Sequence, residues 1–168
     1  MPDFVMPELS SLAHEVNDIR SQYMAVHNAI FRPSIRKAIP IPGIFKPIRF
    51  ADHLSTLSRC FGSLRKTQAI IAESHNGKPM PQENQAFLTV LAEYTSALCY
   101  TIQSLKATCE KLAEKSAGHG EYSLKTYEKD VQDYQRSARQ YMQVGLRLNT
   151  AWDQLRGTGA PKVGGCSL

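Results

Sequence analysis

Residues 124–155 read LKTYEKDVQDYQRSARQYMQVGLRLNTAWDQL, and this stretch decides the fold. Apolar, aromatic and small residues recur along it every three or four positions without a break: Leu124, Tyr127, Val131, Tyr134, Ala138, Tyr141, Gly145, Leu148, Trp152 and Leu155. This spacing places all of them on one stripe of an α-helix, and the stripe must be buried against another element. At 1.5 Å per residue the helix is about 50 Å long, so the chain must supply partners of similar length.

Proline and glycine divide the rest of the chain into three more amphipathic segments. The predicted helices are residues 7–31, 49–75, 82–117 and 122–156. Pro33, Asn76-Gly77 and the Gly118-His119-Gly120 run supply the breaks between them. Residues 82–117 carry the widest apolar face and are expected to be the most enclosed. Residues 1–156 are therefore predicted to form one domain, and residues 157–168 a flexible glycine-rich tail.

These segments predict an all-α protein, a single four-helix bundle. The short connections 76–81 and 118–121 require the helices that they join to be antiparallel. The long connection 32–48, rich in proline, leaves two orientations open for the first helix. We favour an up-down-up-down order over a parallel first pair because it is the simpler arrangement.

Composition and cysteine usage limit the protein class. The 168 residues suffice for one domain with a core. The sequence contains no run of eighteen apolar residues, so no membrane span is predicted. The N-terminus does not resemble a secretory signal. Cys60, Cys99, Cys109 and Cys166 form no C-x-x-C pair, so we expect free thiols and a cytoplasmic, reducing location, at most peripheral to a membrane.

The sequence lacks the motifs of the common catalytic and cofactor sites. A di-iron bundle needs Glu-x-x-His pairs, and none occurs. His14-Glu15 begins a zinc-protease pattern, but position 18 is Asp instead of the second His. No glycine-rich phosphate loop or nucleophile turn is present either. We therefore expect neither an enzyme nor a metal or cofactor site.

The connection between the first two helices is the main functional candidate. Residues 32–48 contain four basic residues and no acid, and Arg49 extends the run. Its candidate contact residues combine bases with apolar side chains: Arg32, Arg36, Lys37, Ile41, Ile44, Phe45, Lys46 and Arg49. This mixture suits an acidic protein surface or an anionic membrane, and predicts a non-catalytic docking module. The structural alternative is that Ile and Phe fix the loop on the core while the bases are solvated.

Two other functions stay open. One is a membrane-perturbing bundle of the cell-death or toxin type. The other is a carrier of a small apolar ligand, held against one face of residues 122–156. The candidate pocket residues are three tyrosines at seven-residue spacing and two small residues beside them: Tyr127, Tyr134, Ala138, Tyr141 and Gly145. The simpler interpretation is that these tyrosines fill the core.

The sequence also bears on two further kinds of partner, nucleic acid and a second copy of the chain. The basic residues cluster in one connection and do not form a broad stripe, which argues against a nucleic-acid partner. Homo-oligomerisation through leftover apolar positions such as Ile70 or Met142 is left open.

Overall fold

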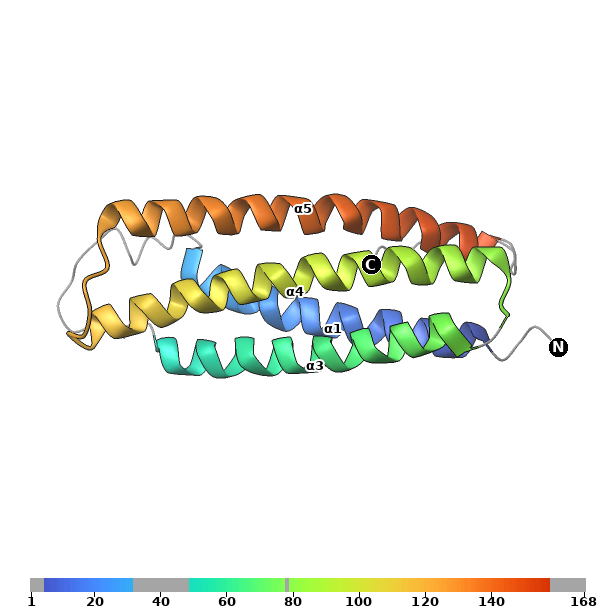
Figure 1. The fold of residues 1–168 in the computed structure, drawn as a ribbon, viewed down its shortest axis with the longest axis horizontal. Coiled ribbons are helices and arrows are strands. Elements are labelled where there is room, and N and C mark those ends of the chain that lie inside the picture. Colours follow the sequence, from blue (N-terminus) through green and yellow to red (C-terminus); the bar gives the residue numbers. More distant parts are fainter. Residues whose placement is uncertain (1–4, 32–48, 78, 158–168) are drawn as a thin grey trace.

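Four long α-helices make up the described chain (Figure 1). The computed structural model describes residues 5–31, 49–77 and 79–157. The helices are α1 (Val5–Phe31), α3 (Phe50–Gly77), α4 (Gln82–Ser116) and α5 (Leu124–Gly157). Within these ranges there is no β-strand, so the predicted all-α class and four-helix bundle are confirmed.

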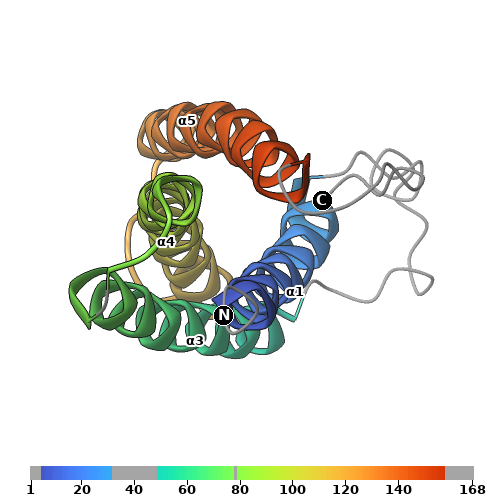
Figure 2. The same ribbon diagram turned by 90° about the vertical axis from the view of Figure 1, so that its right-hand side faces the viewer.

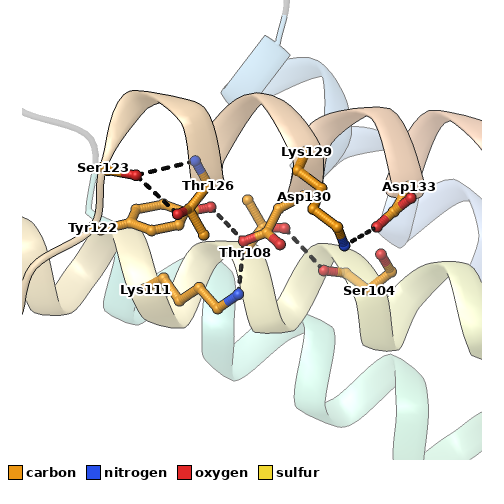
Figure 3. Close-up of polar contacts among 9 residues, drawn as sticks. All are labelled: Ser104, Thr108, Lys111, Tyr122, Ser123, Thr126, Lys129, Asp130 and Asp133. Carbon is orange, nitrogen blue, oxygen red and sulfur yellow. Dashed lines mark hydrogen bonds and ion pairs between the residues drawn. The ribbon is translucent and has the colours of Figure 1, made fainter.

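Local backbone chemistry sets the end of α4 and the start of α5. Gly118 and Gly120 follow α4 with φ values of 77° and 86°, a conformation that glycine adopts without strain. Ser123 precedes α5, and its Oγ accepts a hydrogen bond from the backbone N–H of Thr126 at 3.2 Å (Figure 3). This cap starts α5 at Leu124, slightly later than the start at residue 122 that the sequence predicted.

Successive helices run in opposite directions. In Figure 1, α1 and α4 run from right to left, and α3 and α5 from left to right. The first two helices are therefore antiparallel, which is the up-down-up-down order that the sequence favoured.

Helix α4 is the centre of the packing. It packs along α3 and α5 and also contacts α1. Leu91, Leu98, Ile102 and Leu105 on its core face are all fully buried. The prediction that this segment is the most enclosed is confirmed, because α4 carries thirteen buried residues and α5 only five.

Helices α1 and α5, the first and last of the bundle, stand apart. No Cα atom of α1 lies within 8 Å of one in α5. In contrast, α4 packs against all three other helices, and α1 packs against α3. Figure 2, viewed along the bundle, shows the two ribbons separated on one side. Side chains must fill or leave open the space between them, and this side of the bundle holds the site described below.

The prediction that one stripe of residues 124–155 is buried fails at its first residue. Leu124 is 69% exposed, because it is the first residue of α5 and the chain there has just turned away from α4. Tyr122 takes its place in the packing: its side chain is buried, and its ring meets the Tyr127 ring edge to face. Tyr122, which precedes the cap residue Ser123, therefore makes the core contact that the sequence predicted for Leu124.

Three cysteines lie in the core. Cys60 in α3 and Cys99 and Cys109 in α4 are buried and free, as the sequence predicted. Cys166 lies outside the described residues, as do the tail from residue 158 and the docking residues between 32 and 48. Of the predicted docking residues only Arg49 is described, and its side chain is exposed.

Candidate functional site

A pocket of about 520 Å³ lies between α1 and α5, with α4 behind it. We call it the α1–α5 pocket. Helices α1 and α4 contribute five of its lining residues: Ala13, Val16, Asn17, Arg20 and Tyr94. Helix α5 contributes the other eight: Arg139, Tyr141, Met142, Gln143, Gly145, Leu146, Leu148 and Asn149. The volume lies within the range of small-molecule pockets in proteins, roughly 300–1,000 Å³.

Helical periodicity explains which residues line the pocket. The α1 residues are spaced by three and four positions and so occupy one face of that helix. On α5, Tyr141 and Leu148 are buried on the core side, while Met142 and Leu146 are 52% and 70% exposed at the mouth. The pocket therefore has an apolar interior and an apolar rim that is open to solvent.

The back of the pocket depends on a glycine. A Cβ atom placed on Gly145 would lie 3.1 Å from Cε2 of Tyr94, so the absence of a side chain lets that ring approach α5. The Tyr94 ring then meets the Tyr141 ring edge to face, with centroids 6.0 Å apart. Two tyrosine rings thus form one wall of the pocket.

A group of aromatic residues outside the pocket lining bridges α1 and α5. The Tyr134 hydroxyl lies 2.5 Å from the Tyr23 hydroxyl and 2.6 Å from Nδ1 of His27. Phe31 stacks on the Tyr134 ring, and the Tyr141 hydroxyl donates to Sδ of Met24 at 3.5 Å. We call Tyr23, His27, Phe31 and Tyr134 the aromatic bridge.

Burial controls the protonation of the aromatic bridge. It raises the pKa of Tyr23 and Tyr134 and lowers the pKa of His27. A neutral His27 accepts a hydrogen bond from the Tyr134 hydroxyl at Nδ1, and the oxygen of Tyr134 accepts one from Tyr23. The hydroxyls of Tyr23 and Tyr134 and Nδ1 of His27 are then all paired, which suits a structural role better than proton transfer.

Two arginines at the pocket lack an acidic partner. Within the described residues, neither Arg20 nor Arg139 forms an ion pair. Arg20 is half-buried and donates to Oδ1 of Asn17 at 3.4 Å. Burial raises the pKa of Tyr94 to about 12, while the charge of Arg20 acts in the opposite direction. Burial also raises the pKa of Tyr141, again opposed by Arg20, so this guanidinium lies beside both rings.

Only two of the five predicted ligand residues lie at the pocket. Tyr141 and Gly145 line the α1–α5 pocket. Tyr134 belongs to the aromatic bridge, Ala138 packs half-buried against the core, and Tyr127 packs on Tyr122. Sequence reasoning missed the opposite wall, above all Val16, Arg20 and Tyr94. The periodicity of residues 7–31 marked Val16 as a core position, but no signal showed that α5 would stand away from it.

A second polar cluster joins α4 to α5 at the end of the bundle where the two helices connect (Figure 3). The Asp130 carboxylate accepts hydrogen bonds from Nζ of Lys111 and from the Tyr122 hydroxyl, both at 2.7 Å. Burial raises the pKa of Asp130, but these two hydrogen bonds outweigh it and hold the pKa below its usual value. Since the charges of Lys111 and Asp130 are satisfied by each other, this cluster fixes the α4–α5 connection and offers no free acid, base or nucleophile.

Metal-ligand clusters and membrane-spanning helices are absent from the described ranges. No group of three His, Cys, Asp or Glu side chains there could hold a metal ion. None of the described helices is long and apolar enough to cross a membrane. A second groove, between α4 and α5, contains Glu93 and Arg147, which form an ion pair at 2.7 Å. No family model matches the chain, and neither the curated proteins nor the solved structures contain a significant match.

Proposed function

We propose that this protein is a non-catalytic carrier that binds a small ligand with an apolar body in the α1–α5 pocket. The observation that carries the proposal is the open space of about 520 Å³ between two helices whose facing side chains are largely apolar. An apolar ligand would cover Val16, Leu148 and the exposed Leu146, and removing such surface from water is favourable by about 25 cal/mol per Å². The hydroxyls of the aromatic bridge are engaged in hydrogen bonds with each other and with His27, which supports binding over catalysis.

The test is binding of an uncharged apolar dye, N-phenylnaphthylamine, to the full chain. Its fluorescence rises on entering an apolar site. Ala13→Trp places an indole at the pocket wall and is expected to weaken dye binding by at least about tenfold, since it fills the volume that the dye needs. Ala25→Trp makes the same change at an exposed α1 position and is expected to keep the wild-type affinity.

Two results would contradict the proposal. One is a wild-type protein that does not bind the dye, and the other is equal binding by both tryptophan variants. Ala13 is buried, so folding of its variant is checked by circular dichroism. If it does not fold, Met142→Asp at the exposed rim replaces it and is expected to weaken dye binding by making the mouth polar.

Docking through residues 32–49 remains a second proposal. The sequence observation that favours it is the run of five bases, Arg32 to Arg49, without an intervening acid, beside isoleucine and phenylalanine. Changing Arg32, Arg36, Lys37 and Lys46 together to Gln is expected to leave the circular dichroism unchanged and to abolish sedimentation with anionic vesicles. Persistent co-sedimentation of this variant would place any membrane contact elsewhere, and dye release from the same vesicles separates docking from membrane perturbation.

A further inference from the structure

The α1–α5 pocket differs in character along its length. Two contacts fix how the antiparallel helices α1 and α5 lie against each other: Tyr23 meets Tyr134, and Met24 meets Tyr141. Moving along α1 toward its N-terminus therefore means moving along α5 toward its C-terminus. Arg20 then lies at the level of residues 139–143, and Ala13 near residue 149. Arg20 and Arg139 consequently share the end of the pocket that adjoins the aromatic bridge.

The opposite end is mostly apolar. Ala13 and Val16 on α1 face the level of Leu146 and Leu148 on α5, and Asn149 is the polar residue among them. From Arg20 to Ala13 the axis of α1 advances by about 10 Å at 1.5 Å per residue. The pocket thus offers a charged end followed by about 10 Å of mostly apolar wall, roughly two helical turns.

The charge at the pocket contrasts with the groove on the neighbouring face. In that groove the guanidinium of Arg147 is neutralised by Glu93. Among the described side chains no carboxylate does the same for Arg20 or Arg139. Arg20 is moreover half-buried beside two tyrosine rings, where an ion is screened less by solvent than on an open surface.

We propose that the ligand is an amphipathic anion, with a carboxylate bound at Arg20 and Arg139 and an aliphatic tail lying along Val16, Leu148 and Ala13. This inference rests on the carrier function proposed above and specifies its ligand class. The planar guanidinium of Arg20 can donate two parallel hydrogen bonds to a carboxylate. Asn17 and Gln143 add amide donors at the same end, and exposed Arg139 adds charge at the mouth. The Tyr94 and Tyr141 rings lie beside this end and keep it partly dry.

The test compares two probes that share a tail. Decanoate and decan-1-ol are titrated into the full chain by calorimetry at neutral pH, with acetate as the head group alone. We expect decanoate to bind at least about tenfold more tightly than decan-1-ol, as a charge-assisted hydrogen bond in a partly buried site should provide. Acetate is expected not to bind measurably, because it lacks the apolar tail.

Matched arginine variants then assign the head-group site. Arg20→Gln is expected to remove the preference for decanoate over decan-1-ol, and circular dichroism checks that the variant is folded. Arg147→Gln, an arginine in the groove on the neighbouring face, is expected to change neither affinity. Arg139→Gln is expected to lower decanoate affinity by a smaller factor, since its side chain is exposed and more screened.

The outcomes separate the two proposals. If both probes bind equally to the wild type, the head-group inference is overturned and the apolar pocket stands. If Arg20→Gln and Arg147→Gln lower decanoate affinity equally, the preference reflects overall charge, and the inference is also overturned. If neither probe binds, the carrier function itself fails. A dimer in light scattering that dissociates under Leu146→Asp would then identify a second copy of the chain as the occupant of the pocket.

Discussion

The two sides of α5 are built differently. Toward α4 the backbones pack closely, and the ring of fully buried Phe87 on α4 meets the Trp152 ring on α5 with centroids 5.2 Å apart. Toward α1 no backbone approach exists, and the contact is made by large side chains of the aromatic bridge at one end only. The α4 side therefore provides most of the stability, and the α1 side provides the space.

The residues on each side match these roles. Close helix packing excludes voids large enough for a ligand, because the side chains interdigitate at crystal-like density. Two long rings and hydroxyls can hold helices apart at one end, while small residues farther along, Ala13 and Gly145, leave the space unfilled. Each prediction below changes a residue on one of these two sides.

The largest effect is expected from the α4 side. Leu98→Ala removes a fully buried side chain and should lower the free energy of unfolding by about 2–5 kcal/mol, through lost burial and the cavity left behind. Leu146→Ala at the pocket rim, 70% exposed, should change it by about 0.5 kcal/mol or less. Urea denaturation followed by circular dichroism measures both, and equal losses would refute the assignment of stability to the α4 side.

The next effect tests the aromatic bridge. Tyr134→Phe leaves the ring stack with Phe31 in place but removes the hydroxyl that pairs with both Tyr23 and His27. Leaving buried polar groups unpaired should cost about 1–3 kcal/mol of unfolding free energy. Tyr100→Phe is the control, because Tyr100 is 65% exposed. A loss in Tyr134→Phe no larger than in the control would mean that the hydroxyls do not hold α1 against α5.

A smaller effect should appear as pH dependence. Burial lowers the pKa of His27 in the folded state below its unfolded value of 6.5. The unfolded state therefore binds more protons in this window, so stability is complete above about pH 6.5 and falls as the pH drops toward the folded pKa. Protonation would also remove the acceptor for Tyr134 at Nδ1. His27→Gln, which can still accept but does not titrate, should flatten the slope between pH 7 and 5, and an unchanged slope in that variant would exclude His27 as its source.

The sequence predicted the helices better than the site. Proline and glycine mark the helix ends, and three-four periodicity marks the buried faces, so Tyr134, Tyr141 and Leu148 were expected in the core. Both signals are local to one helix. The distance between α1 and α5 depends instead on which side chains meet, and Tyr23 with Tyr134 are separated by 111 positions in sequence. The α1 and α4 residues of the pocket wall were therefore beyond sequence reasoning, and of the α5 lining only Tyr141 and Gly145 were predicted as pocket residues.

The smallest change in stability is expected at Gly145, which lines the pocket and lies against Tyr94 of α4. Gly145→Ala should gain about 1 kcal/mol of helix propensity. The new Cβ would lie 3.1 Å from Tyr94, so that ring must shift and some of the gain is lost. We expect a net change of about 0.5 kcal/mol or less by urea denaturation, with weaker binding of N-phenylnaphthylamine because Tyr94 moves into the pocket. Unchanged dye affinity would show that the ring does not form the pocket wall.

The buried thiols also have a practical consequence. Burial raises the pKa of Cys109 to about 12 and raises the pKa of Cys60 and Cys99, so almost no thiolate is available while the helices stay packed. Alkylation of each sulfur must then wait for a fluctuation that opens its surroundings. Peptide mapping after timed exposure to iodoacetamide would report the opening of α3 through Cys60 and of α4 through Cys99 and Cys109. A ligand in the α1–α5 pocket would slow these reactions only by stabilising the whole bundle, so the three alkylation rates would measure how far its effect extends.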